Sequence, residues 1–420
     1  MERYSEYKHS NVSWIGMIPK HWGSKQLRSF LTLFTEKGHG EAQLLSVTRE
    51  QGVIERDKED KEENHNYVPE DLSGYKYIEK GDFAINKMKA WQGSYAVSDY
   101  CGIVSPAYFT CKLQGVNKKF FSRAIRSKAY VPFFTQYSKG IRVGQWDLNP
   151  NALKSIPFFL PPLAEQEKIV SYLESKTSKI DAYVADKEKE IQLFQELKQK
   201  TIAEAVTKGL NPNVKMKDCS ISWIGMIPEH WEVKKIGSLF TERREKVSDK
   251  DYPALSVSKQ GITPQLETAV KTDNGDNRKK VCKDDFVVNS RSDRKGSCGV
   301  SPYTGSVSLI NIVLSPRNNI EVQYFHHLFR SNDYIEEYYR IGRGIVADLW
   351  TTRYSEMRNI MVPLPPLDEQ RSIVSYIEEK CQKIDTLITE LQAEIDYLKE
   401  YKQRLIADVV TGQVNVQNEI

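Results

Sequence analysis

The chain of 420 residues contains a long internal repeat with a constant offset. Residues 160–166 read LPPLAEQ, and the sequence LPPLDEQ returns 204 residues later, at 364–370; the likeness continues without a gap for 40 residues more. A second motif, WIGMIPKHW at 14–22, returns as WIGMIPEHW at 223–231, with an offset of 209. A fixed long period indicates a duplicated architecture. We therefore expect two halves, each with a Trp-rich opening, a globular stretch and a final repeated segment.

Each final segment is predicted to be one long helix. Two prolines precede it, and a Glu-Gln pair falls in its first turn, where negative charge suits the helix dipole. Neither proline nor glycine interrupts the run, so about 40 residues at about 1.5 Å each would make a rod of roughly 60 Å. Apolar residues recur at helical spacing and define one seam on each rod: Ile169, Leu173, Ile180, Val184, Ile191 and Phe194 on the first, and Ile373, Ile377, Ile384, Ile388, Ile395 and Leu398 on the second.

Two arrangements of these rods are open at this point. Each rod could pack only against its own globule, or the two seams could face each other. Because both rods have the same length and the same period, the two-helix coiled coil is the favoured interpretation.

Composition narrows the class of protein. No apolar run approaches the 18 residues of a membrane span, and residues 1–10 lack the apolar core of a signal peptide. The six cysteines make no Cys-x-x-Cys pair, which argues against a zinc site or a disulfide framework and favours a cytoplasmic location. The net charge of +4 is mildly basic, so nucleic-acid binding would depend on local clustering of the cations.

The globular stretches share a skeleton although their loops differ. LSV at 45–47 matches LSV at 255–257, and Asp82-Phe83 matches Asp285-Phe286. Short apolar segments such as 83–85, 102–104 and 307–310 are typical of strands, and residues 120–130 and 323–339 are predicted to be helices. Each globule is therefore expected to be mixed α/β (α+β). One fold with different loops indicates two different binding surfaces.

Those loops are the candidate site. The stretch NKMKAWQGS at 86–94 and its counterpart NSRSDRKGS at 289–297 each join two expected strands, and a second basic loop precedes each rod, at 139–146 and 340–346. Lysine and arginine bind phosphates, while arginine, glutamine and asparagine can also read base edges. A lone basic loop is most often a solvated surface, but matched loops in both halves favour DNA contact. The candidate DNA-binding residues are Lys87, Lys89, Trp91, Gln92, Lys139, Arg142, Gln145, Asn289, Arg291, Arg294, Lys295, Arg340 and Arg343.

The motifs of several enzyme classes are missing from the sequence. It contains no P-loop, no dinucleotide-binding fingerprint, no nucleophile elbow and no Asp/Asn-Pro-Pro-Tyr/Phe motif of an amino-methyltransferase. His21 and His230 have no partner at metal-ligand spacing. The acidic run at 55–63 alternates with lysines and is expected to be a solvated loop rather than a nuclease site. We expect neither a catalytic nor a metal site in this chain.

Taken together, the paired WIGMIP-x-HW openings, the NKMKAWQGS loop and the paired LPPL-x-EQ rods resemble the specificity (S) subunits of type I restriction–modification systems. The resemblance covers nearly the whole chain in the family's order. It implies two target-recognition domains, 1–158 and 209–362, two long helices, 159–208 and 363–412, that form an antiparallel coiled coil with pseudo-two-fold symmetry, and a tail, 413–420.

The resemblance also implies partners and a division of labour. Each domain would read one half of a split double-stranded DNA target, and the rods would dock two methyltransferase (M) subunits. Two restriction (R) subunits would complete the complex. S-adenosylmethionine, ATP and Mg²⁺ would bind to the partner subunits, and no cofactor to this chain. Lys87, Lys89, Trp91 and Gln92 match the family's loop motif, whereas the second loop departs from it, which implies two different half-sites.

Three alternatives remain at this point. The chain could be a scaffold whose globules bind proteins, an enzyme that acts on DNA by itself, or the S subunit of a system that only methylates. If the chain is a specificity subunit, the rigid rods would act as a ruler: they would set the length of the DNA between the two half-sites, whose sequence is not recognised. An insertion of four residues after Glu190 should then shift that gap and leave both half-sites unchanged.

Overall fold

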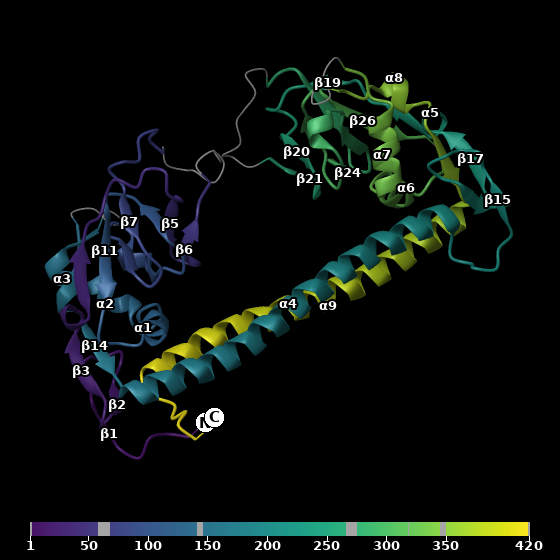
Figure 1. The fold of residues 1–420 in the computed structure, drawn as a ribbon. Helices are drawn as coiled ribbons and strands as arrows, with labels where there is room; N and C mark the ends of the chain where they lie inside the picture. The colour runs from purple at the N-terminus through teal and green to yellow at the C-terminus, as the bar shows by residue number, and fades with distance from the viewer. Residues whose placement is uncertain are drawn as a thin grey trace. The chain divides into compact units, whose positions relative to one another are not determined.

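The computed structural model describes residues 2–57, 68–140, 146–265, 275–317, 319–344 and 350–418. The chain forms two compact units, the first from residues 1–187 and 393–420 and the second from residues 188–392. Each unit contains one globule and part of each long helix, α4 (Leu163–Lys208) and α9 (Leu367–Val410) (Figure 1). The mixed α+β class predicted from the sequence is confirmed. Within the described ranges, no helix combines the length and the apolar character that crossing a bilayer requires.

The globule of the first unit is built on an antiparallel four-stranded sheet. Its order is β4 (Leu31–Phe34), β11 (Tyr108–Leu113), β8 (Phe83–Asn86) and β9 (Tyr95–Val97). The other strands form antiparallel pairs: β1 (Tyr7–His9) with β2 (Met17–Pro19), β3 (Gly23–Gln26) with β14 (Pro157–Leu160), β5 (Leu45–Thr48) with β6 (Gly52–Glu55), β7 (Lys76–Ile78) with β10 (Gly102–Val104), and β12 (Ser138–Lys139) with β13 (Asp147–Leu148).

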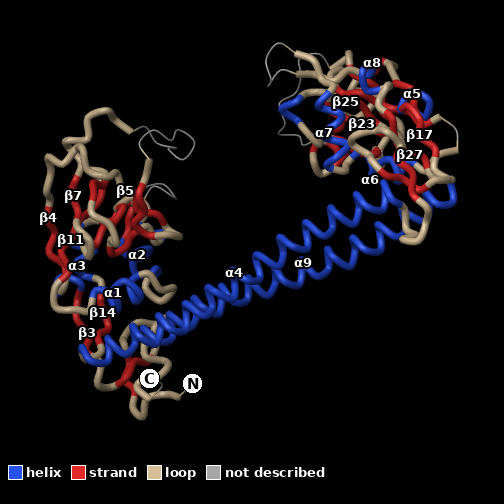
Figure 2. Tube along the Cα trace, turned by 45° about the vertical axis from the view of Figure 1, so that its right-hand side comes forward, coloured by secondary structure: helices blue, strands red, loops and turns tan. Residues whose placement is uncertain are grey.

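The globule of the second unit repeats this plan (Figure 2). Its four-stranded sheet has the order β18 (Phe240–Glu242), β26 (Asn311–Pro316), β23 (Phe286–Asn289) and β24 (Cys298–Val300). The remaining strands are β15 (Met216–Asp218) with β16 (Met226–Pro228), β17 (Glu232–Lys235) with β27 (Met361–Leu364), β20 (Leu255–Ser258) with β21 (Gly261–Pro264), and β19 (Lys246–Val247), β22 (Arg278–Val281) and β25 (Gly305–Val307) in one sheet.

The shorter helices correct the sequence prediction. Where one helix was expected at 120–130, α1 (Lys118–Ile125) ends and α2 (Val131–Tyr137) begins anew with a proline in its first turn. Where one helix was expected at 323–339, α6 (Val322–Phe329) stops and Ser331 caps α7 (Asn332–Arg340) by accepting from Tyr334 N. The strand expected at 307–310 ends at Val307, and a turn follows it. The remaining short helices are α3 (Pro150–Ser155), α5 (Ile236–Leu239) and α8 (Tyr354–Met357), with 3-10 turns η1 (Leu27–Ser29), η2 (Ala90–Gln92) and η3 (Ser292–Arg294).

The glutamine of each LPPL-x-EQ motif fastens a long helix to its globule. Gln166 is buried, donates to Pro161 O at 2.8 Å and accepts from Asn117 N at 2.9 Å. Gln370, 204 residues later, donates to Pro365 O at 2.8 Å and accepts from Glu321 N at 2.9 Å. Because the amide satisfies backbone groups on both sides of the joint, the repeated glutamine has a structural explanation.

The glutamate beside it binds the Trp-rich opening. In the first unit, Glu165 is buried and accepts from Tyr4 Oη at 2.6 Å and Trp22 Nε1 at 3.0 Å, with His21 Nε2 at 2.8 Å. In the second unit, His230 Nε2 lies 2.8 Å from Glu369 Oε2, while no partner is found for the buried Nε1 of Trp231 among the described residues. The two repeated motifs are therefore two sides of one joint.

The long helices pack antiparallel, as the resemblance implied. In the first unit Lys402 pairs with Asp181 at 2.6 Å, and in the second Lys198 pairs with Asp385 at 2.6 Å. Both lysines and both aspartates differ by the repeat offset of 204, so the two ion pairs occupy equivalent positions of the repeat. The lysines lie seven residues beyond Ile191 and Ile395, on the seam itself, where a charged residue fixes register at a cost in stability.

The predicted seam residues lie inside the helix pair or under a globule. Buried are Ile169, Leu173, Val184, Ile373, Ile377, Ile384 and Ile395, and half-buried are Ile180, Ile191, Phe194, Ile388 and Leu398. The ends of the rods also enter the globular cores: Ile169 and Leu173 join the core of the first unit with Leu405 and Val409, and Ile373 and Ile377 join that of the second unit with Val206. The two arrangements considered from the sequence thus coexist.

The end of α9 closes the first unit. Gly412 follows the helix with φ +73°, and a Cβ there would come 2.3 Å from Pro19 Cδ, so only glycine fits. Beyond it, Asn415 N donates to Glu2 O at 2.9 Å, and Val416 is fully buried. The two ends of the chain are consequently neighbours in this unit (Figures 1 and 2).

Acid should weaken the second unit more than the first. His326 and His327 lie on α6, and burial lowers the pKa of His326 to about 3 and that of His327 to about 4; Val300 N donates to Nδ1 of His326 at 3.1 Å. In the unfolded chain both titrate near 6.5, so their neutral forms stabilise the fold fully above that pH. This stability is lost as the pH falls from about 6.5 towards 3, by on the order of 1–3 kcal/mol per histidine.

Unfolding in urea at pH 7 and pH 4.5, followed by hydrogen exchange, measures this loss for each unit. The first unit has Ser122 and Arg123 at the equivalent positions and serves as an internal control. The double variant His326→Gln/His327→Gln should lose less stability between the two pH values than the wild-type chain. If the variant lost as much stability between the two pH values as the wild-type chain, the two histidines would not be the cause of the acid sensitivity.

Candidate nucleic-acid interface

In the first unit, the loop after β8 is a tight turn that presents its polar side chains. Lys89 N donates to Asn86 O and Asn86 N to Ser94 O, both at 3.0 Å, which closes the loop at its base. The turn contains η2 and leaves through Gly93 at φ +99°, a backbone conformation that glycine favours. Lys89 and Gln92 are exposed and Lys87 and Trp91 half-buried.

The chain before the first rod packs against this loop. Leu148 N donates to Lys87 O at 3.1 Å, and Lys87 Nζ lies 3.1 Å from Asp147 Oδ2. The rings of Trp91 and Trp146 are 5.1 Å apart between centroids. Lys139 is exposed at the start of the same segment, on β12. Arg142 and Gln145 lie outside the described residues. The described residues that follow the second loop's masked part, from Trp146 to Leu148, therefore lie against the first loop.

The second unit brings its two loops together in the same way. Thr352 N donates to Ser290 O at 3.0 Å, and Ser292 N donates to Trp350 O at 2.9 Å. Thr351 forms bridges with both Arg291 and Arg343, one residue from each loop. Although this loop has a different sequence, the backbone joins the segment before the rod at equivalent places.

The cations of the two surfaces, one in each unit, fall into two groups. Some are paired with acids of the chain: Lys87 with Asp147, Arg291 and Arg294 with Asp293 at 2.9 and 3.7 Å, Lys295 with Glu336 at 2.5 Å, and Arg340 with Glu337 at 2.7 Å. Hydrogen bonding to Glu337 also raises the pKa of Arg340. Lys89, Lys139 and Arg343 are exposed and make no ion pair with any described residue. A phosphate would meet these three without first displacing an internal partner.

Sequence reasoning overlooked an aromatic pair. Trp146 is the last residue of the loop at 139–146, and Trp350 lies four residues beyond the loop at 340–346, so neither is among the predicted DNA-binding residues. They are 204 residues apart, so the repeat offset could have identified them. Trp350 is 39% exposed and lies against η3, as Trp146 lies against Trp91. Each surface thus has a tryptophan beside its cations, and a flat ring can stack on a base or pack against a sugar.

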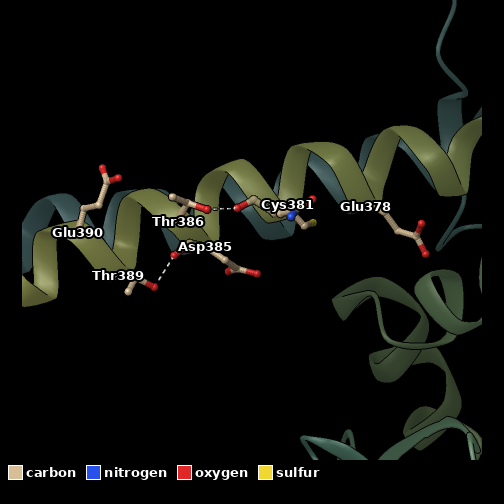
Figure 3. Close-up of a pocket in the computed structure, with 7 residues that line it drawn as sticks. Glu378, Cys381, Asp385, Thr386, Thr389 and Glu390 are labelled. Carbon is tan, nitrogen blue, oxygen red and sulfur yellow. Dashed lines mark hydrogen bonds between the residues drawn. The ribbon is translucent and has the colours of Figure 1, made fainter.

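No catalytic constellation accompanies these loops in the described ranges. No cluster of three or more His, Cys, Asp or Glu side chains found there could hold a metal. Figure 3 shows a shallow hollow along α9, lined by Glu378, Cys381, Gln382, Asp385, Thr386, Thr389 and Glu390. There, Thr386 and Thr389 donate to carbonyls of their own helix and Asp385 pairs with Lys198. Those groups are already engaged, and burial raises the pKa of the Cys381 thiol, which disfavours the thiolate that a nucleophile would need.

Comparisons with known proteins agree on one family. The family described as the type I restriction modification DNA specificity domain matches residues 228–397. The putative type I restriction enzyme MjaX specificity subunit of Methanocaldococcus jannaschii is 26% identical over 66% of this chain and 63% of its own length. The type I restriction enzyme EcoBI specificity subunit of Escherichia coli is 23% identical over 72% of this chain and 66% of its own. The matched regions span just under two thirds of these two relatives.

The fold is shared by a solved structure. It comes from work on complex assembly and conformational transition of the type I R-M system. Its chain aligns with a TM-score of 0.66 at 16% identity, covering 94% of this chain and 99% of that one. At this identity the likeness supports the fold alone.

Proposed function

Because this chain belongs to the type I restriction–modification DNA specificity family, we propose that it is the DNA-recognition subunit of such a complex. The observation that carries the proposal is the meeting of two loops in each unit. In both units, a basic turn after a central strand (β8 or β23) joins the segment that leads into a long helix. A protein that reads two DNA segments needs two such surfaces, with cations for phosphates and polar groups for bases.

We assign the two surfaces to two different half-sites. Lys89, Trp91 and Gln92 of the first loop correspond to Ser292, Arg294 and Lys295 in the second. Different side chains on one backbone plan favour an asymmetric, bipartite target. We retain the division into recognition domains at 1–158 and 209–362, helices at 159–208 and 363–412, and a tail at 413–420.

The chemistry of the complex belongs to partner subunits in this proposal. Two M subunits would dock on the rods and transfer methyl groups from S-adenosylmethionine, and two R subunits would supply the ATP- and Mg²⁺-dependent cleavage. This chain would be non-catalytic and would act in the cytoplasm, where its DNA target lies and where its six unpaired cysteines stay reduced. A complex without R would be a methylation-only system, and DNA recognition by this chain would be the same.

The double variant Lys89→Ala/Lys139→Ala tests the DNA surface. Both lysines are exposed, and neither forms an ion pair with a described residue, so their loss should not disturb the fold. We expect DNA affinity of the complex with M to fall at least about tenfold at low salt. The slope of log K against log salt should decrease by about two, since each phosphate contact contributes about 0.9.

Lys20→Ala is the matched control, because Lys20 is exposed in the same unit but pairs with Glu6 in the Trp-rich opening. Its DNA affinity and salt slope should match the wild-type values. If Lys89→Ala/Lys139→Ala also retained both, DNA binding by this surface would be excluded. A wild-type complex that captured proteins but showed no salt-dependent DNA binding would favour a scaffold.

A further inference from the structure

The exposed apolar residues of the rods occur in pairs that follow the repeat. Tyr183 and Leu387, Leu193 and Tyr397, and Leu197 and Tyr401 are each 204 residues apart and are between 42% and 76% exposed. None belongs to the seam. Scattered apolar residues on a surface need no explanation, but the same three positions in both copies do.

Within each unit the register of the helices brings these residues to one level. In the first unit, the pair Asp181–Lys402 brings Tyr183 of α4 and Tyr401 of α9 to the same level of the helix pair. Lys187 Nζ lies 5.4 Å from the ring centre of Tyr183 and 3.4 Å from Glu394, which precedes Tyr397 by three residues. This face, of Tyr183, Tyr397 and Tyr401, is called the tyrosine face.

The second unit has leucine at all three equivalent places. The pair Lys198–Asp385 brings Leu197 of α4 to the level of Leu387 of α9, and Leu193 lies one turn before Leu197 on the same side. This face, of Leu193, Leu197 and Leu387, is called the leucine face.

Charged residues extend both faces in one repeated order. On α4 they alternate with the apolar residues at steps of three and four, which keeps them on one side of the helix. Their charges recur in the second copy: Lys176 and Lys380, Lys179 and Lys383, Asp186 and Glu390, Glu190 and Glu394, Lys200 and Arg404, and Glu204 and Asp408. Each unit therefore presents an apolar centre with basic and acidic groups in equivalent places.

This pattern suits two copies of one partner. The recognition loops differ between the halves, so a repeated outer face must meet a partner that is the same on both sides. That partner would place apolar residues opposite the centre, acids opposite the lysine pair and bases opposite the acidic pair. The apolar centres, however, differ in all three residues.

We infer that the two faces bind two copies of the M subunit with unequal affinity, and that the tyrosine face binds first. The inference rests on the proposed function, which supplies M as the partner. One M surface cannot fit three tyrosines and three leucines equally well. Tyrosine is enriched among the residues that dominate interface energies, whereas leucine is under-represented among them. The complex would thus pass through a state with one M on the first unit.

The experiment is dilution of the assembled complex, followed by native mass spectrometry of the species with two, one and no M. We expect the two dissociation constants to differ by about tenfold or more, beyond the ratio that statistics give for two equal sites. Tyr397→Ala/Tyr401→Ala should weaken the tighter step and leave the weaker one unchanged. Leu193→Ala/Leu197→Ala, the matched pair, should weaken only the weaker step.

A further variant tests the inference without removing binding energy from either face. Tyr183→Leu/Tyr397→Leu/Tyr401→Leu gives both faces the same apolar centre and should bring the two constants to the statistical ratio. Two equal constants in the wild-type complex, or a loss of both steps in each double variant, would overturn the inference and leave the proposed function standing. A wild-type chain that bound no M at all, with M shown to be folded, would overturn both.

Discussion

Replacing Glu165 by glutamine is expected to destabilise the first unit by about 2–4 kcal/mol. The buried carboxylate accepts from Tyr4 and Trp22 and binds His21. An amide has one oxygen, and its NH₂ group would face a donor, so at least one buried partner loses its acceptor. A hydrogen bond to a charged group contributes about 1.5–3 kcal/mol, and leaving a buried donor unpaired adds to the loss.

Glu369→Gln provides a control that the repeat itself supplies. Glu369 is more exposed, and His230 is its hydrogen-bond partner, so the expected loss is about 1 kcal/mol or less. Urea unfolding with hydrogen exchange read separately for 1–187 and 188–392 distinguishes the two units. Equal losses for the two variants would show that the joint does not depend on the buried carboxylate.

Duplicating one heptad in both rods, 184–190 in α4 and 386–392 in α9, is expected to lengthen the gap between the half-sites. The ion pairs Lys187–Glu394 and Lys198–Asp385 show that both insertion points lie at the same level of the helix pair. Seven residues keep the seam in phase and add about 10 Å, which equals about three base pairs along the DNA axis. Rods inclined to that axis would add less, so we expect a gap longer by about one to three base pairs.

The measurement is the methylation motif that the altered complex writes in a cell. Seven residues added after Asn418 instead serve as the control, because they lengthen the chain but not the rods. Both half-sites should stay unchanged in either variant. A heptad variant with the original gap, or with new half-sites, would show that the rods do not set the spacing.

The rods and the fold class could be predicted because their signals are local. A run without glycine or proline and with a period of three and four residues specifies a helix, and two equal runs specify a pair. Their antiparallel arrangement came from the family resemblance, although Lys198 and Asp385, with their copies Lys402 and Asp181, contained the same information. These charges could not be interpreted until the register was known.

The joint and the interface were harder to predict because they depend on contacts between distant residues. Glu165 and Trp22 were both found as parts of repeated motifs, but 143 residues separate them, and nothing local indicated that they meet. Trp350 lies outside the basic loop at 340–346, and only its offset of 204 from Trp146 connects it with the predicted surface. The apolar period predicts one helix at 323–339, but the chain forms two helices there. The side chain of Ser331 caps the start of the second one, and an apolar pattern does not show such a cap.

Methylome sequencing of cells that express this chain with its M subunit tests the central claim most directly. The account predicts a new DNA methylation motif with two different half-sites, separated by a gap of fixed length. Cells that express the Lys89→Ala/Lys139→Ala variant instead should lack that motif, or should show a less specific sequence at one half-site only. If an M subunit that is active with another S subunit wrote no new motif with this chain, or wrote a continuous or palindromic one, the account of two dissimilar readers would be contradicted.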